Sequence, residues 1–183
     1  MPLILITGTS TSGKSTVAKE LIKRGYEAYD TEHDGISAWH NKETGKRAAE
    51  FGEMPERTEE WLNQHEWLIS IDWVTELAKK AAGKPIFLCG GSSNEAEVRA
   101  MCQKVIWLKT NEKTIRQRVI NPRDHDYGTK PHELAAAVEN NKQKEAEYRE
   151  IGAVMVDATQ PIEDVTKDVL AETSLYSLSF LQP

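Results

Sequence analysis

The sequence predicts an α/β protein in which a five-stranded parallel sheet lies between two layers of helices. Two observations predict this three-layer α/β/α fold. Segments with apolar residues at helical spacing alternate with short runs of strand length, most of them apolar, at 3–7, 26–29, 86–89, 105–108 and 153–157. An alternation of this kind produces parallel strands joined by right-handed helical crossovers.

The predicted elements follow one another in a regular order. The first strand, 3–7, is a continuous apolar run of the kind that a buried parallel strand shows. The first helix, 15–24, carries Val17, Ala18 and Leu21 at helical spacing and stops at Gly25. Further helices are predicted over 58–82, over 95–102, from 110 onward, over 131–149 and over 162–173.

Between the first strand and the first helix lies a phosphate-binding pattern, Gly8-Thr9-Ser10-Thr11-Ser12-Gly13-Lys14-Ser15. Its two glycines permit a sharp turn and a close approach of the backbone to a phosphate. Successive N–H groups and the helix N-terminus attract anions, the lysine reaches the β- and γ-phosphates, and the last serine can bind Mg²⁺. The alternative is a turn that binds nothing, and the flanking strand and helix favour the phosphate site.

Three carboxylates, Asp30, Glu32 and Asp34, follow the second strand. Open α/β sheets bind their ligands at the carboxyl ends of the strands. One carboxylate there can orient Mg²⁺ or its waters, and another can accept a proton from an attacking hydroxyl, which leaves the assignment of the two roles open. The alternative is a solvated acidic turn with a helix N-cap. His33 is expected to be a surface histidine.

Residues 31–82 are expected to form an insert on the acceptor side of the site. Its polar part, 36–57, is predicted to be irregular: either Trp39, Lys46 and Arg47 contact the acceptor, or the stretch is a mobile surface loop. A single long helix is predicted over 58–82, with a wide apolar face and the three tryptophans Trp61, Trp67 and Trp73. The tryptophans suggest an aromatic ligand wall, but a stripe at helical spacing favours core or a dimer face.

The third strand ends at Cys89-Gly90, without the aspartate that many phosphate-loop enzymes place there to hold Mg²⁺ through water. Later in the chain, 116–131 forms a short charged connection between two helices and carries Arg116, Arg118 and Arg123. It is predicted to be a small lid that places arginines on the migrating charge. An ordinary connection with solvated arginines is the alternative.

Composition narrows the class of protein. The 183 residues, 39% hydrophobic and 28% charged, fit one domain spanning 1–183. A net charge of -6 argues against a nucleic-acid partner. No apolar stretch approaches the roughly 20 residues that span a bilayer, and the N-terminus lacks the order of a signal peptide, so we expect no membrane partner. Cys89 and Cys102 are expected to be reduced residues in or near the core of a cytoplasmic protein.

The order of strand, loop and lid resembles the nucleoside monophosphate kinase group of phosphate-loop kinases, which includes adenylate, shikimate and gluconate kinases. The resemblance covers about 3–170 and implies a P-loop NTPase fold that uses ATP and Mg²⁺. Asp30-Thr31-Glu32 resembles the Asp-Thr-Asp of shikimate kinases, which implies that Asp30 lies near Mg²⁺ and Glu32 near the acceptor hydroxyl, with Asp34 as an alternate. Asp157-Ala158-Thr159-Gln160-Pro161 resembles the loop beside the adenine. The chain departs from the group in lacking the Asp-Gly of adenylate kinases after the third strand.

The sequence therefore predicts an ATP-dependent small-molecule kinase. Its acceptor is a nucleotide, a nucleoside or a small hydroxy acid, and the protein is a monomer or a homodimer. The transferred phosphoryl group is predicted to be stabilised by Lys14, Arg116 and Arg123. The acceptor hydroxyl is predicted to be positioned by Asp30 and Glu32. The Mg²⁺ ion is predicted to be held by Ser15 and Asp30. ATP is expected to lie on Gly8, Thr9, Ser10, Thr11, Ser12, Gly13, Lys14, Ser15 and Thr16. The rivals are a nucleotide hydrolase or switch, an ATP-binding interaction protein without transfer activity, and a kinase of RNA ends.

Overall fold

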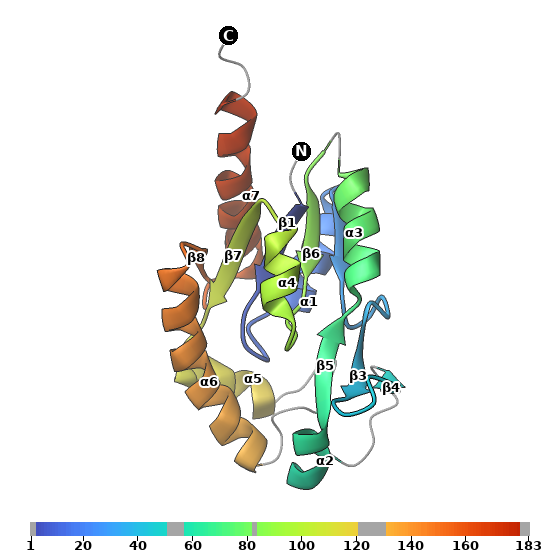
Figure 1. Cartoon of the computed structure of the whole chain (residues 1–183). Coiled ribbons are helices and arrows are strands. Elements are labelled where there is room, and N and C mark those ends of the chain that lie inside the picture. Colours follow the sequence, from blue (N-terminus) through green and yellow to red (C-terminus); the bar gives the residue numbers. More distant parts are fainter. Residues whose placement is uncertain (1–2, 51–56, 82–83, 121–130, 180–183) are drawn as a thin grey trace.

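Five parallel strands form the central sheet of the computed structural model, which describes residues 3–50, 57–81, 84–120 and 131–179 (Figure 1). The strands lie in the order β2–β6–β1–β7–β8, so the first strand of the chain is the middle strand of the sheet. All five predicted strands are confirmed to within one residue. They are β1 (Leu3–Thr7), β2 (Glu27–Asp30), β6 (Ile86–Cys89), β7 (Lys104–Lys109) and β8 (Val154–Asp157).

Helices cover both faces of this sheet, as predicted. The helices predicted at 15–24, 95–102, 131–149 and 162–173 are confirmed, although the last runs on to Ser179. None of the described helices is both long enough and apolar enough to cross a membrane. The helices outside the insert are α1 (Lys14–Lys23), α4 (Glu95–Ala100), α5 (Glu112–Ile120), α6 (Pro131–Glu150) and α7 (Ile162–Ser179).

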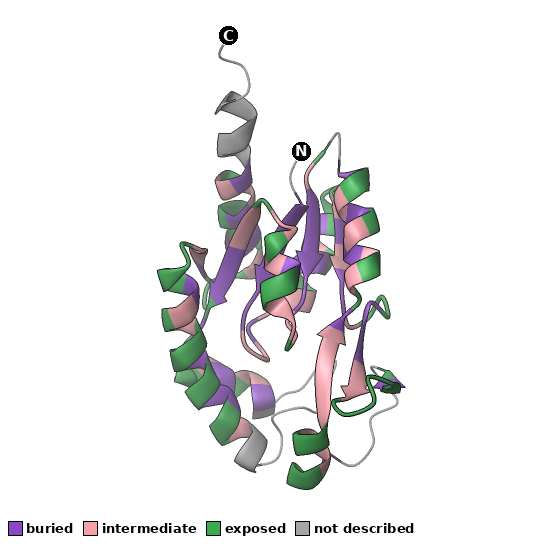
Figure 2. Cartoon of the chain, in the orientation of Figure 1, coloured by how far each residue is buried: buried purple, intermediate pink, exposed green. Residues whose placement is uncertain are grey.

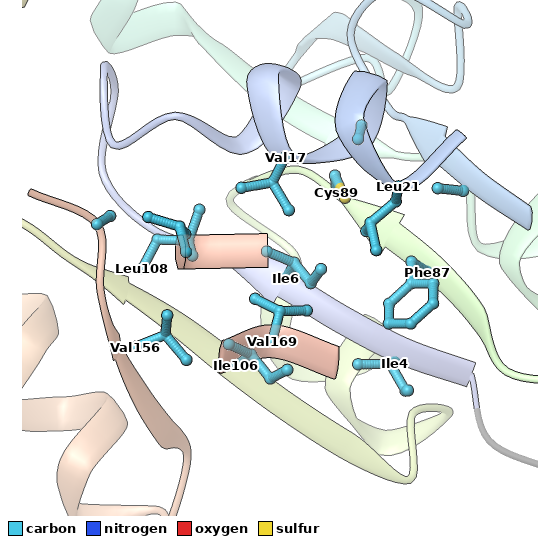
Figure 3. Packing of buried hydrophobic residues seen from close by; sticks show 14 residues of the cluster. Ile4, Ile6, Val17, Leu21, Phe87, Cys89, Ile106, Leu108, Val156 and Val169 are labelled. Atoms are coloured by element: carbon cyan, nitrogen blue, oxygen red, sulfur yellow. The ribbon is translucent and has the colours of Figure 1, made fainter. Parts of the chain in front are cut away.

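Side chains that alternate along the strands form a hydrophobic core on each face of the central sheet. Figure 2 shows that the central strands are largely buried, whereas the helices carry both buried and exposed residues. Ile4 and Ile6 of β1 point toward α1 and α7, where they meet Val17, Leu21 and Val169, as Figure 3 shows. Leu3 and Leu5 point to the other face, toward α4 and a helix of the insert, α3 (Ile71–Lys80). Because both faces of β1 are covered, its five residues are all buried and the run is apolar throughout.

The insert contains a second sheet, which is antiparallel. Its strands lie in the order β4–β3–β5 and are β3 (Ser37–Asn41), β4 (Arg47–Glu50) and β5 (His65–Ile69). The Asn41 side chain accepts from the N–H groups of Glu43 and Thr44 in the turn between β3 and β4, which Gly45 completes at a φ of 66°. In Figure 1 this sheet and α5 lie below the central sheet, at the end where its strands finish, and α6 runs up from there toward β8 and β7.

Two predictions for the insert are wrong. The stretch 36–57, predicted to be irregular, contains β3 and β4. The single helix predicted over 58–82 is instead α2 (Glu59–Gln64), then β5, then α3, which begins at the N-cap Ser70. Five residues of β5 pair with β3, and these ladder hydrogen bonds outweigh a helical pattern that is only a weak preference.

The tryptophans of the predicted stripe consequently fall on three elements. Trp73 of α3 packs against the second core and meets Tyr29 edge to face at 4.8 Å. Trp61 of α2 and Trp67 of β5 instead surround Trp39 of β3, with ring centroids 5.0 Å and 5.4 Å away. The core prediction is therefore right for Trp73, while the other two belong to a half-buried cluster within the insert.

The ends of β2 and β6 approach each other at Gly90. A Cβ at this position would lie 2.0 Å from Thr31 Oγ1 and 2.9 Å from Thr31 Cβ. Thr31 is fully buried and its backbone N–H donates to the Cys89 carbonyl oxygen at 3.0 Å, so it has little room to move. The turn that carries Asp30, Glu32 and Asp34, called the acidic turn below, therefore contacts the glycine that follows β6.

Gly90→Ala is expected to lower the free energy of unfolding by about 1–3 kcal/mol, because the added methyl group overpacks the contact with Thr31. Urea denaturation measures this change. In a Thr31→Ala background the penalty should shrink, since two of the three atoms nearest the new Cβ are then absent. Equal penalties in the two backgrounds would contradict the contact.

Candidate functional site

The loop between β1 and α1 has the backbone shape that an anion site needs. Thr11 and Gly13 both adopt positive φ angles, 65° and 104°, which turn successive N–H groups toward one side. At Gly8 a Cβ would lie 2.6 Å from Ser12 Oγ and 3.0 Å from the Leu108 carbonyl oxygen, so only glycine fits. The loop is thus held tightly against the strand end of β7 as well as its own residues.

The groups expected to hold an anion are present at this loop. The N-cap residue of α1, Gly13, makes no side-chain capping bond, and the first turn contains no acidic residue. Thr11 Oγ1 is buried and has no hydrogen-bond partner in the described part of the chain. An uncapped helix N-terminus and an orphaned hydroxyl both fit the oxygens of a phosphate. The residues present therefore fit the triphosphate that the motif predicts.

Lys14 folds back onto the loop. Its Nζ donates to the carbonyl oxygens of Gly8 at 2.9 Å and Thr9 at 3.0 Å. These neutral acceptors leave the ammonium charge uncompensated at the loop, and an anion can compensate it. Ser15 follows in the first turn of α1 and is partly buried, whereas Thr16 is exposed. Of the loop residues, Ser15 carries the hydroxyl that fits a Mg²⁺ ion on the phosphates.

The acidic turn lies at the same edge of the sheet as the loop. Asp30 is opposite Cys89 in the β2–β6 register, and Cys89 is opposite Ile6 of β1. Burial and, after it, the charge of Asp30 raise the pKa of the Cys89 thiol, whereas the Lys14 ammonium lowers it. The thiol is buried, which confirms Cys89 as a core residue, and its raised pKa disfavours the nucleophilic thiolate.

The three carboxylates of the turn differ in what they bind. Asp30 is 7% exposed; its Oδ1 accepts from the N–H groups of Glu32 and His33, and its Oδ2 lies 2.8 Å from His33 Nδ1. Asp34 Oδ2 accepts from the Asp30 N–H at 2.8 Å. No described residue forms a hydrogen bond with the partly buried Glu32 carboxylate. Two of the acids therefore hold the turn together, and the third is available.

Arg118 of α5 reaches the loop, although Arg116 and Arg123 were the predicted site arginines. Its Nη1 donates to the carbonyl oxygens of Thr11 and Ser12, both at 2.9 Å, and its Nη2 donates to that of Ala158 at 2.7 Å. Burial lowers the pKa of this guanidinium, which stays protonated. Arg118 therefore ties the phosphate loop to the segment after β8.

The two predicted arginines lie elsewhere. Arg116 points away into solvent, where its guanidinium forms an i,i+4 ion pair with Glu112 at 2.8 Å. Arg123 lies outside the described residues, as does most of the predicted lid, 121–130. Helical spacing cannot choose between Arg116 and Arg118, because each occupies its own face of α5 and only the tertiary packing decides which face meets the loop.

Sequence reasoning missed a second set of contacts, from α6 and α4. Asn141 of α6 is buried; its Oδ1 accepts from Thr9 Oγ1 at 3.0 Å and its Nδ2 donates to the Thr110 carbonyl oxygen at 3.1 Å. Glu95, the first residue of α4, accepts from Thr7 Oγ1 at 2.8 Å. No local sequence signal marks these residues, because their partners lie 132 and 88 positions away.

A metal site made of protein groups alone is not found: among the described residues, no three His, Cys, Asp or Glu side chains gather closely enough to hold an ion. Mg²⁺ is usually bound through one or two protein groups together with phosphates of the substrate. The Ser15 hydroxyl fits that arrangement. The other predicted ligand, Asp30, has contacts with Glu32 and His33 in its own turn, and its role at the metal stays a prediction.

The sequence profile of a family described as an AAA domain matches residues 4–150. A comparison with curated proteins finds no match. Among solved structures, a gluconokinase from Sinorhizobium meliloti is similar at a TM-score of 0.56 and 20% identity, over 99% of this chain and 97% of that one. The shikimate kinase from Acinetobacter baumannii in complex with shikimate is similar at a TM-score of 0.57 and 17% identity, over 100% of this chain and 96% of that one. A deoxyadenosine kinase from M. mycoides is similar at a TM-score of 0.53 and 14% identity, over 94% of this chain and 98% of that one. These similarities establish a shared fold.

Arg118→Ala is expected to lower the free energy of unfolding by about 1.5–3 kcal/mol, because it leaves three carbonyl oxygens in a partly buried position without their charged donor. The matched variant Arg116→Ala removes an exposed pair and should cost no more than about 1 kcal/mol. Denaturant unfolding of the ligand-free protein compares them. Equal losses in the two variants would show that the contacts of Arg118 with the loop contribute nothing specific.

Proposed function

Because the chain belongs to the family described as an AAA domain and has the fold of phosphate-loop kinases, we propose that it is an ATP-dependent kinase of a small-molecule acceptor. One observation carries this proposal: an uncapped phosphate loop and an acidic turn with an available carboxylate occupy the same edge of the sheet. The loop suits a triphosphate donor, and the carboxylate suits an acceptor hydroxyl.

The donor half rests on the loop. Phosphoryl transfer is catalysed mainly by positioning and electrostatic stabilisation. Lys14 would exchange its contacts with Gly8 and Thr9 for phosphate oxygens, and the Ser15 hydroxyl would hold Mg²⁺, whose chemistry when bound is to neutralise phosphate charge. Arg118 would keep the loop in shape, since its donors already serve three carbonyl oxygens. Arg116 and Arg123 stay predictions for the migrating charge.

The acceptor half rests on Glu32. The sequence leaves the roles of Asp30, Glu32 and Asp34 open, but their contacts favour one assignment. The carboxylates of Asp30 and Asp34 accept hydrogen bonds from backbone N–H groups of the turn. Glu32 is therefore the carboxylate that can orient the acceptor hydroxyl and accept its proton. Asp30 then acts by fixing the turn on which Glu32 stands.

The insert is proposed to bind the rest of the acceptor. Ser37 at the start of β3 donates through both its N–H and its hydroxyl to the Thr31 carbonyl oxygen in the acidic turn. At the other side, the Ser93 N–H after β6 donates to the Trp67 carbonyl oxygen at 2.7 Å. The second sheet is therefore fixed to both loops that flank the acceptor position. We propose a nucleotide, a nucleoside or a small hydroxy acid as the acceptor, in a cytoplasmic protein.

The release of ADP from Mg·ATP tests the proposed reaction. It should increase in the presence of one member of a panel of nucleoside monophosphates, nucleosides, shikimate-like acids and sugar acids, and Lys14→Ala should abolish it, because the ammonium that meets the phosphates is gone. Equal release without any acceptor would establish a hydrolase instead. ATP binding without release for any member of the panel would favour an interaction protein and contradict the proposal.

Glu32→Gln should lower kcat by about 10²-fold or more while the affinity for ATP stays unchanged, because the proton acceptor is lost and the loop is not. Glu76→Gln, an exposed change on α3, is the matched control and should leave both constants at their wild-type values. Initial rates and nucleotide titrations measure the two constants. A variant that loses ATP binding but keeps its turnover would move Glu32 out of the acceptor role.

A further inference from the structure

A fourth carboxylate, outside the acidic turn, lies beside the phosphate loop. Glu95 begins α4, six residues after β6 ends at Cys89, and the residue that follows β6 is Gly90 and not an acid. Its Oε1 accepts from Thr7 Oγ1 at 2.8 Å and from the Ser92 N–H at 3.4 Å, and its Oε2 accepts from the Tyr148 hydroxyl of α6. Three different elements therefore fix the position of this one carboxylate.

Gly91 shows how close Glu95 comes to the loop. A Cβ at Gly91 would have three nearest neighbours: Glu95 Oε1 at 3.3 Å, Thr7 Oγ1 at 3.6 Å and the Gly8 carbonyl oxygen at 3.7 Å. The Gly8 carbonyl oxygen is the atom to which Lys14 Nζ donates at 2.9 Å. The Glu95 carboxylate and the Gly8 carbonyl group that Lys14 contacts thus both border the space in front of Gly91.

The donors to Glu95 are all neutral. A hydroxyl, an amide N–H and a phenol satisfy three of the roughly four lone-pair sites of a carboxylate and leave its charge in place. Arg99 of the same helix pairs with Glu147 at 3.3 Å and lies over the Tyr148 ring, 5.1 Å from its centroid. No ion pair with Glu95 forms in the described part of the chain, so the charge of this carboxylate is not paired with a cationic side chain and lies beside the phosphate loop.

Such a charge repels a bare triphosphate and attracts a cation that the triphosphate carries. Mg²⁺ keeps several of its waters and is bound through one or two carboxylates together with phosphates. We propose that Glu95 is the positioning carboxylate for the divalent cation on the bound nucleotide. It does from the start of α4 what an acid at the end of β6 would do, and Thr7 and Tyr148 hold it in place. This inference rests on the nucleotide site of the proposed function but not on transfer to an acceptor.

Titration of the protein with a fluorescent ATP analogue, in EDTA and at increasing Mg²⁺, tests the role of Glu95. Mg²⁺ should increase the affinity of the protein for the analogue. In Glu95→Gln, the Mg²⁺ concentration that gives half of this increase should be about 10- to 100-fold higher than in the wild type. In EDTA the same variant should bind the analogue at least as tightly as the wild type, because a repulsive charge is gone. Glu97→Gln, an exposed glutamate on the same helix, is the matched control and should change neither value.

Variants at Thr7 separate positioning from folding. Thr7→Val removes the donor without changing the side-chain shape and should shift the Mg²⁺ dependence in the same direction as Glu95→Gln, whereas Thr7→Ser keeps the hydroxyl and should restore it. An unchanged Mg²⁺ dependence in Glu95→Gln, or an equal loss of affinity with and without Mg²⁺, would overturn the proposal.

The two proposals fail in distinguishable ways. If the Mg²⁺ dependence shifts as expected while no acceptor is phosphorylated, Glu95 keeps its role and the kinase reaction is rejected. If an acceptor is phosphorylated while Glu95→Gln binds Mg²⁺ and nucleotide as the wild type does, the kinase stands and Glu95 loses its role. A wild-type protein that does not bind the analogue at all would reject both.

Discussion

The close contact of the phosphate loop with its surroundings is the constraint on which the rest of the structure depends. Gly8 is in contact with Ser12 on one side and with the end of β7 on the other. This is possible because β1 is the central strand, with β6 and β7 as its neighbours. The same strand order brings the acidic turn after β2, the glycines after β6 and the segment after β8 to one edge. The two hydrophobic cores, one on each face of the sheet, hold the strands whose ends form this edge.

Much of the framework could be predicted from the sequence. The buried strands are recognisable because each must be apolar on both faces or nearly so, and the phosphate loop is recognisable because its backbone requires glycine at fixed places. The insert could not be predicted. His65–Ile69 has the apolar spacing of a helix, and only its five pairings with β3 make it a strand. Those pairings join residues about thirty positions apart, which no local pattern encodes.

The candidate site divides in the same way. The phosphate loop with Lys14 and the acidic turn each directly follow a predicted strand of the sheet in the sequence. Their residue pattern and their place after a strand are therefore enough to predict them as site residues. Arg118, Asn141 and Glu95 act through partners on distant elements, and a composition or periodicity argument treats them like any other polar residue. Distinguishing Glu32 from Asp30 required knowing which carboxylate the turn itself uses, and this depends on hydrogen bonds that the sequence does not specify.

Helix α6 contacts the phosphate edge twice, through Asn141 at Thr9 and through Tyr148 at Glu95. These residues are seven positions apart, which is close to two full turns of an α-helix, so both side chains leave the same face. Removing one residue between them would rotate one contact by about 100° relative to the other. The number of residues between these two positions is therefore constrained independently of their types: an insertion or deletion in this stretch would separate the two contacts even if every remaining side chain were kept.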